Sequence, residues 1–174
     1  MARNVEIKAH VSSIEALLPR VHALAGHGPE LIAQDDTFFA CAVGRLKLRV
    51  FADGRGELIA YERLDAAGPK TSDYRISPVT DPDALRTTLA RALGVTGRVV
   101  KQRTLFLVGR TRVHLDRVEG LGDFLELEVV LRDGERTELG EAEAQALLAS
   151  LQVDASQLVV GAYVDLLRAL KPPN

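Results

Sequence analysis

The feature that most constrains the fold of this chain is a strict alternation of apolar and polar residues that recurs along its length. Residues 3–11, 45–50 and 124–129 each alternate apolar side chains with charged or polar ones. A period of two residues is typical of a β-strand with one buried face and one polar face. The alternation therefore predicts strands that supply both a hydrophobic core and a second, polar surface.

Turn residues divide the chain into eight such strands. We expect them at residues 3–11, in two segments of 31–51 that join near Gly44, and at 57–64, 71–77, 98–108, 110–118 and 124–129, with a loop at 66–70. Apolar residues at helical spacing predict helices at 14–24 after a cap at Ser12 or Ser13, at 82–93 after the cap Asp81, and roughly at 139–151 and 157–170. Residues 1–174 contain no linker or low-complexity tract, so we expect a single domain.

Composition excludes several classes of protein. A net charge of −2, from 22 basic and 24 acidic side chains, argues against a general nucleic-acid-binding protein, so any basic site must be local. No stretch approaches the roughly 18 apolar residues of a membrane span. The single cysteine, Cys41, has no internal disulfide partner and is interpreted as a buried small residue of a reducing compartment. We therefore expect a cytoplasmic protein that binds neither nucleic acid nor membrane.

Strands linked largely by turns are compatible with two arrangements. In the first, an antiparallel sheet closes into a barrel, amphipathic helices pack outside it, and the polar strand faces line the lumen. In the second, helices cover one face of an open sheet and water covers the other. Alternation alone does not separate them, but the distribution of charge favours the first. The predicted class is α+β, with a closed eight-stranded antiparallel β-barrel and amphipathic helices packed outside.

Charges of one sign gather on particular strands, whereas a solvated sheet face usually mixes both signs. The basic positions are Lys47, Arg49, Arg63, Lys101, Arg103 and Arg112, and the acidic ones are Glu6, Asp116, Glu126 and Glu128. Two like charges about 4 Å apart repel by roughly 4 kcal/mol at an effective dielectric near 20. Gathered guanidinium and ammonium groups suit a chain of phosphates. Carboxylates beside them suit Mg²⁺ or Mn²⁺, which bridge carboxylates to phosphates.

The order of these residues resembles the CYTH superfamily of triphosphate tunnel enzymes, which includes class IV adenylate cyclases, thiamine triphosphatases and inorganic tripolyphosphatases. The resemblance runs from about residue 3 to residue 167. It is carried by Glu6-Ile7-Lys8, by residues 45–49, by Lys101 and Arg103, and by residues 115–122 and 124–128. It implies a closed tunnel of eight antiparallel strands that binds a triphosphate through basic side chains and divalent cations through glutamates.

The resemblance also assigns roles by position. It implies that Glu6, Glu126 and Glu128 are ligands of Mg²⁺ or Mn²⁺. It implies phosphate contacts for the basic set of Lys8, Lys47, Arg49, Arg63, Lys101, Arg103 and Arg112. Lys8 and Arg103, with Asp116 near the metal, are the predicted catalytic residues. This chain has Asn4 where the family signature has its first glutamate, and an amide oxygen adds no negative charge, so we expect a second cation to bind more weakly.

Four other polar or aromatic residues have less decisive roles. His10 and His114 lie on polar strand faces and are interpreted as tunnel-lining or structural. Tyr61 either contacts a phosphate or bridges the interior and the rim, and Tyr163 is expected in the core.

The sequence therefore predicts a metal-dependent enzyme that acts on a triphosphate, most like a class IV adenylate cyclase that converts ATP to cyclic AMP and pyrophosphate. A phosphohydrolase of tripolyphosphate, thiamine triphosphate or a nucleotide needs the same residues and stays open. A non-catalytic module that binds polyphosphate or nucleotide also stays open because of Asn4. A homodimer is a further open alternative.

Overall fold

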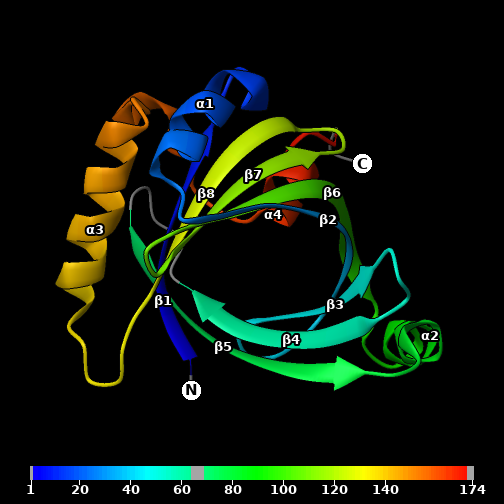
Figure 1. The fold of residues 1–174 in the computed structure, drawn as a ribbon. Helices are drawn as coiled ribbons and strands as arrows, with labels where there is room; N and C mark the ends of the chain where they lie inside the picture. The colour runs from blue at the N-terminus through cyan, green and yellow to red at the C-terminus, as the bar shows by residue number, and fades with distance from the viewer. Residues whose placement is uncertain (1, 64–68, 172–174) are drawn as a thin grey trace.

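The strands of the computed structural model, which describes residues 2–63 and 69–171, form a closed antiparallel barrel (Figure 1). Their order around the barrel is β1-β5-β4-β3-β2-β6-β7-β8. The strands are β1 (Ala2–His10), β2 (His27–Phe39), β3 (Arg45–Phe51), β4 (Gly56–Arg63), β5 (Lys70–Val79), β6 (Val95–Val108), β7 (Thr111–Val118) and β8 (Gly122–Val130). The predicted eight-stranded barrel is confirmed, and the open sheet is excluded.

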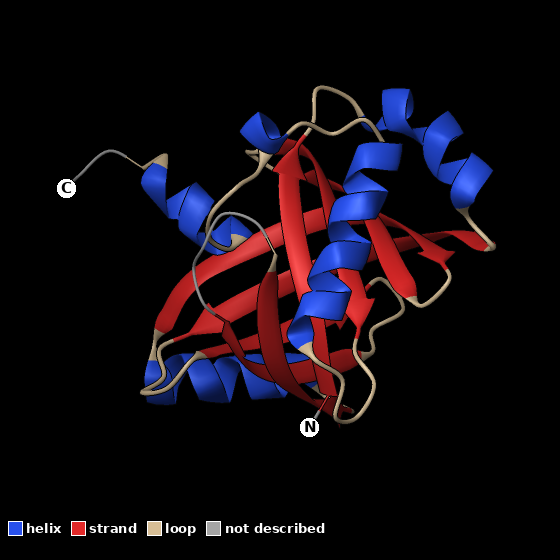
Figure 2. Cartoon of the chain, turned by 90° about the vertical axis from the view of Figure 1, so that its left-hand side faces the viewer, coloured by secondary structure: helices blue, strands red, loops and turns tan. Residues whose placement is uncertain are grey.

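Helices lie outside the strands, as Figures 1 and 2 show. They are α1 (Ile14–Leu24), α2 (Pro82–Leu93), α3 (Thr137–Ser150), the short 3-10 helix η1 (Ala155–Gln157) and α4 (Tyr163–Ala169). Two begin at the predicted caps, because the side chains of Ser13 and Asp81 accept hydrogen bonds from the first turns of α1 and α2. None of the described helices is long and apolar enough to cross a membrane.

The main hydrophobic core lies between the outer face of the barrel and the helices α1 and α3. Val5, Ile7 and Ala9 of β1 point into this core, where they meet residues such as Val21 of α1 and Leu147 of α3. Full burial of one such side chain contributes about 1.5–3 kcal/mol. Because the apolar residues of β1 face outward, the alternate residues face the lumen, as the alternation predicted.

The chain departs from the predicted helix over residues 157–170. The backbone N–H of Val159 donates to the carbonyl of Lys8 at 2.9 Å, and Leu158 bridges Ala9, so residues 158 and 159 lie beside β1 and residues 158–162 are not helical. Gly161 adopts a φ of 89°, which leads the chain into α4 at Tyr163. The pairing with β1 is a tertiary contact that helical periodicity does not encode.

Three smaller differences concern single elements. β2 begins at His27 rather than at residue 31, and it continues to Phe39. Cys41 is exposed, so its prediction as a buried residue is wrong; it lies in the connection between β2 and β3 rather than in a strand. The predicted loop at 66–70 falls mainly on residues 64–68, which lie outside the described residues.

Candidate active site

The lumen of the barrel contains a cavity of about 300 Å³. All eight strands contribute lining residues, because every second side chain of each strand faces inward. The charged residues along it are Glu6, Lys8, Asp36, Lys47, Arg49, Lys101, Arg103, Arg112, Glu126 and Glu128. Six of these are basic and four are acidic, so the charges that line the cavity favour an anion.

Asp36 of β2 lies between two of the predicted phosphate-binding residues. Its Oδ2 is 2.8 Å from Lys47 Nζ, and its Oδ1 is 2.8 Å from Arg49 Nε. Burial alone would raise the pKa of Asp36, but the charges of Arg49 and Lys47 hold that pKa well below its ordinary value. The predicted segregation of charge is therefore incomplete, since this pair of basic residues has a buried carboxylate as partner.

Asp116 of β7 organises a second group of contacts. Both of its oxygens accept hydrogen bonds from Arg103, each at 2.7 Å, and Oδ2 also accepts one from the Tyr163 hydroxyl at 2.9 Å. Lys101 Nζ lies 3.6 Å from the same oxygen. Although burial opposes ionisation, Arg103 and Lys101 lower the pKa of Asp116. Asp116 is therefore a carboxylate that fixes the guanidinium plane of Arg103.

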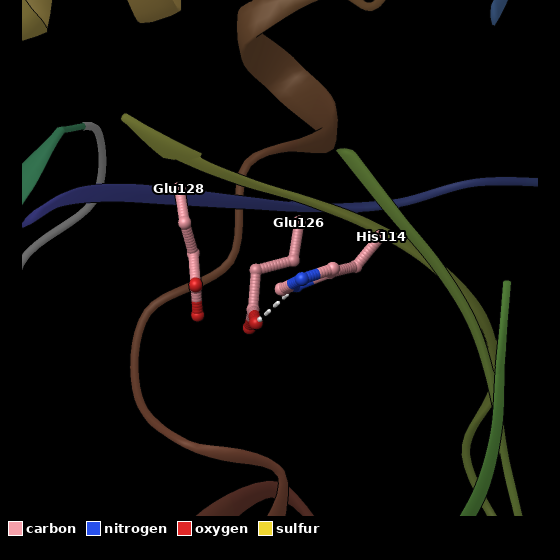
Figure 3. A group of neighbouring side chains, drawn as sticks. All are labelled: His114, Glu126 and Glu128. Atoms are coloured by element: carbon pink, nitrogen blue, oxygen red, sulfur yellow. Dashed lines mark hydrogen bonds and ion pairs between the residues drawn. The ribbon is translucent and has the colours of Figure 1, made fainter. Parts of the chain in front are cut away.

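Glu126 of β8 is the acidic centre of the lumen. It accepts a hydrogen bond from Arg103 Nη2 at 3.0 Å and lies 3.0 Å from Lys8 Nζ and 3.3 Å from His114 Nδ1. The neighbouring Glu128 accepts a hydrogen bond from Arg112 at 2.9 Å. Figure 3 shows Glu126, Glu128 and His114 together on adjacent strands.

The same three residues fit a divalent cation. One ligand atom from each of His114, Glu126 and Glu128 lies within 4.8 Å of the other two. Glu6 pairs in register with Glu128 on the next strand. Lys8 Nζ lies 3.6 Å from Oε1 of Glu6. Asn4 Oδ1 is buried, lines the cavity and makes no hydrogen bond to the described part of the chain. The carboxylate oxygens of the glutamates and the amide oxygen of Asn4 are chemically suited to Mg²⁺ or Mn²⁺, and the imidazole of His114 adds a nitrogen donor beside them.

Tyr163 is buried as predicted, but it also belongs to the site. Lys8 Nζ lies 4.1 Å and Lys101 Nζ 5.0 Å from the centre of its ring, and its hydroxyl donates to Asp116. Burial and the nearby Arg103 lower the pKa of Lys101 to about 7, although Asp116 acts in the opposite direction. Tyr163 thus links α4 to two lysines and one carboxylate of the lumen.

The structure brings most of the predicted site residues to one cavity. The lining includes Lys8, Lys47, Arg49, Lys101, Arg103, Arg112, Glu6, Glu126, Glu128, His114 and Tyr61, with Asp116 completely buried behind Arg103. His10 is exposed and instead packs edge-on against Phe124. The side chain of Arg63 lies outside the described part of the chain.

Sequence reasoning missed Asp36 as a lumen residue. Asp35 and Asp36 are adjacent, and only one of two neighbouring strand residues can face inward. The register of β2 with β3, which sets Asp36 opposite Arg49, decides between them. The alternation of Gln34, Asp36 and Phe38 is the signal in the sequence that could have identified Asp36.

Comparison with known proteins gives a consistent picture. The family model described as CYTH domain matches residues 2–163. Adenylate cyclase CyaB of Aeromonas hydrophila is 27% identical over 171 residues, which cover 91% of this chain and 85% of that protein.

Solved structures share the fold. The PH1012 protein of Pyrococcus horikoshii superposes with a TM-score of 0.83 at 23% identity, over 94% of this chain and 98% of that one. A Hippeastrum protein described as a putative adenylyl cyclase with a dominant triphosphatase activity has a TM-score of 0.69 at 16% identity, over 98% and 97% of the two chains.

Proposed function

This chain belongs to the CYTH domain family, and from that premise we propose that it is a metal-dependent enzyme that acts on a triphosphate. The reaction we propose first is that of a class IV adenylate cyclase, in which ATP is converted to cyclic AMP and pyrophosphate. The observation that carries the proposal is the convergence of six basic side chains on one closed lumen, next to the carboxylates of Glu126 and Glu128. The kinship with adenylate cyclase CyaB supports the choice of reaction.

The basic residues of the lumen can bind phosphates by exchanging partners. Lys47 and Arg49 share Asp36, and Arg103 uses Asp116 and Glu126, so their donors already converge on oxygen atoms. Phosphate oxygens provide the same type of acceptor with more negative charge. In this proposal Lys47, Arg49, Lys101 and Arg112 hold the triphosphate along the tunnel.

Glu126 and Glu128, with Glu6 and the imidazole of His114 beside them, would hold Mg²⁺ or Mn²⁺, a hard cation that polarises phosphoryl oxygens. Lys8 and Arg103 then contact the reacting phosphates and stabilise negative charge that develops on the leaving pyrophosphate. Asp116 acts through Arg103, because both of its oxygens already accept hydrogen bonds from that guanidinium. The 3′-hydroxyl of ATP attacks the α-phosphorus, and the bond to pyrophosphate breaks.

A second candidate is hydrolysis of tripolyphosphate, thiamine triphosphate or a nucleotide within the same lumen. The Hippeastrum relative supports it, because that protein is described by a dominant triphosphatase activity. A non-catalytic binding module is the third candidate. It is motivated by Asn4, which provides a neutral oxygen where the resemblance places a glutamate.

Product analysis tests these three candidates. Purified protein is incubated with ATP and, separately, with tripolyphosphate in the presence of Mg²⁺ or Mn²⁺. Cyclic AMP with pyrophosphate supports the cyclase, and orthophosphate supports the hydrolase. Tripolyphosphate binding without turnover supports the binding module, and turnover gained by Asn4→Glu would strengthen that result. If the protein neither binds nor turns over ATP or tripolyphosphate, the proposal is contradicted.

A further inference from the structure

Two groups of charged side chains in the barrel are built on the same pattern. In each group a lysine and an arginine lie two positions apart on one strand. They are Lys47 and Arg49 on β3, and Lys101 and Arg103 on β6. An aspartate of the neighbouring strand pairs in register with the arginine of each group. We call Asp36, Lys47 and Arg49 the β3 clamp, and Asp116, Lys101 and Arg103 the β6 clamp.

The contacts within the two clamps agree atom for atom. In the β3 clamp, Arg49 Nε donates to Oδ1 of Asp36 and Arg49 Nη2 donates to Oδ2, both at 2.8 Å. In the β6 clamp, Arg103 Nε donates to Oδ1 of Asp116 and Arg103 Nη2 donates to Oδ2, both at 2.7 Å. The lysine of each clamp approaches Oδ2 of the same aspartate, at 2.8 Å in the β3 clamp and at 3.6 Å in the β6 clamp. Both aspartates are almost completely buried.

The aspartates use only one side of each guanidinium. An arginine side chain can donate hydrogen bonds through Nε, Nη1 and Nη2. In Arg49 and Arg103 the Nε and Nη2 atoms donate to the aspartates, whereas Nη1 of either residue donates no hydrogen bond within the described part of the chain. A bidentate contact fixes the plane of a guanidinium, and it therefore fixes the direction in which the remaining nitrogen points.

The two clamps lie close enough to repel each other. The strands that carry them, β3, β2, β6 and β7, are consecutive in the barrel, and the basic residues of both clamps line the cavity of about 300 Å³. Burial lowers the pKa of Lys47, and the positive charges of Arg49 and of Arg103 in the other clamp also lower it, although Asp36 acts in the opposite direction. An anion between the clamps would remove the repulsion.

We propose that Asp36 is a positioning residue, which keeps its two hydrogen bonds to Arg49 when a triphosphate binds and directs Arg49 Nη1 toward that anion, as Asp116 does for Arg103. The inference rests on the proposed function, because it takes a triphosphate as the anion in the lumen. The lysine of each clamp exchanges its carboxylate for a phosphate oxygen, whereas the arginine keeps its carboxylate. Two guanidiniums of fixed orientation then bind the phosphates of one anion.

A simpler role for Asp36 predicts the opposite effect of its removal. If Asp36 only neutralised Lys47 and Arg49, its replacement by asparagine would leave one more positive charge in the lumen and strengthen the binding of a polyanion. If Asp36 positions Arg49, the same replacement allows the guanidinium to rotate, and binding weakens because the side chain must be ordered by the ligand. The sign of the change in affinity separates the two roles.

Isothermal titration with tripolyphosphate, in Mg²⁺ and again in EDTA, measures this sign on the intact chain. We expect Asp36→Asn to weaken binding by roughly tenfold to a hundredfold, as for the loss of a charge-assisted hydrogen bond. Asp35→Asn is the matched control. Asp35 is the adjacent residue on the opposite face of β2, and its two oxygens accept hydrogen bonds from Nε and Nη2 of Arg98. The control makes the same change of charge and should not weaken binding.

A second variant decides the question if thermal unfolding shows that Asp36→Asn does not fold. Arg49→Lys keeps the positive charge but lacks the planar donor set that Asp36 aligns, so we expect it to weaken the binding of tripolyphosphate as well. In the Arg49→Lys background, Asp36→Asn should cause no further weakening, because no guanidinium remains at position 49 to be positioned.

The outcomes distinguish the inference from its premise. Binding of tripolyphosphate to Asp36→Asn as tightly as to the wild type, or more tightly, would overturn the inference and leave the proposed function in place. Unchanged binding to Arg49→Lys, or an equal loss from Asp36→Asn and Asp35→Asn, would overturn it in the same way. If the wild-type protein does not bind tripolyphosphate with either Mg²⁺ or EDTA, the proposed function fails and the inference fails with it.

Discussion

Charge pairing at the level of single residues explains how the lumen is stable without a ligand. Each of the six basic residues along the cavity has a carboxylate oxygen within 4.0 Å, and the shared partners are Asp36, Asp116, Glu126 and Glu128. For the most deeply buried of them, Lys8, Lys101 and Arg103, an unpaired charge would cost several kcal/mol. Binding of a triphosphate therefore exchanges internal partners for phosphate oxygens, rather than neutralising bare cations.

Lys101 provides a pH-dependent signature of that exchange. Burial lowers its pKa to about 7, and the negative charge of a bound triphosphate would raise it again. Above pH 7 the free protein carries a neutral Lys101, so binding takes up a proton and affinity falls as pH rises. At about pH 8 we expect titration heats that depend on the ionisation enthalpy of the buffer. Lys101→Arg, which stays charged, should lose this dependence; identical heats in all buffers with the wild type would contradict the expectation.

Glu126 and Glu128 differ in what their replacement should do to stability. Glu126 contacts Lys8, Arg103 and His114 in the buried lumen, so Glu126→Gln should lower the free energy of unfolding by about 3–5 kcal/mol. Within the described part of the chain, the carboxylate of Glu128 forms its ion pair with the partly exposed Arg112, so Glu128→Gln should lower the free energy of unfolding by about 0–1 kcal/mol.

Both variants should lose metal-dependent turnover, because each removes a carboxylate that we propose as a metal ligand. Urea denaturation measures the stability difference, and product formation measures the loss of turnover. Glu143→Gln, at a carboxylate that binds Arg110 outside the barrel, is a control that should keep turnover. Full turnover in both Glu126→Gln and Glu128→Gln would refute the assignment of these glutamates as metal ligands.

Alternation predicted which side chains face inward, but it did not predict their partners. Lys47, Arg49, Lys101 and Arg103 were identified because a two-residue period assigns every position of a strand to one face. The contact of Arg49 with Asp36 depends on the register between β2 and β3, which the period of a single strand does not contain.

At the level of elements, α4 determines how the covered end of the tunnel is built. Gly97 of β6 allows the close approach of α4, since a Cβ there would collide with Cγ2 of Val164. We expect Gly97→Ala to lower the free energy of unfolding by about 1–3 kcal/mol. The displaced helix would also withdraw the Tyr163 ring from Lys8 and Lys101, so turnover should fall as well.

A second substitution tests the cause of this effect. Val164→Ala removes the colliding atom, so the double variant with Gly97→Ala should recover turnover toward the level of Val164→Ala alone. Gly26→Ala is the matched control, because a Cβ at Gly26 meets nothing within 4 Å. Thermal unfolding measures the stability of each variant, and product formation measures its turnover. If the double variant is as impaired as Gly97→Ala alone, the clash with Val164 of α4 is not the cause of the loss of stability and turnover.

The predicted elements were most accurate where local signals and tertiary contacts agree. Ser13 and Asp81 cap α1 and α2 at the predicted ends, because a cap is a local contact. The helix predicted at 157–170 was wrong over 158–162, where the backbone is not helical and contacts β1 at residues 158 and 159. Tyr163 consequently begins α4, a position that places its hydroxyl on Asp116.

At the scale of the whole molecule, barrel closure was predictable from the distribution of charge, but the closing contacts were not. β1 closes the barrel by pairing with β5 on one side and β8 on the other. Both partners are distant in sequence, and contacts of this kind slow folding because a long loop must be ordered before they form. Strand periodicity carries no information about such partners.

The position of β1 also sets the time at which the binding site first exists. β1 carries Asn4, Glu6 and Lys8, while its acidic counterparts Glu126 and Glu128 lie on β8. During synthesis on the ribosome, β5 can pair with one edge of β1 once it has been made, but the other edge of β1 stays unpaired until β8, which begins at Gly122, has followed. The nascent protein cannot recognise a triphosphate before that moment, and its exposed first strand is the segment that chaperones would have to protect from aggregation.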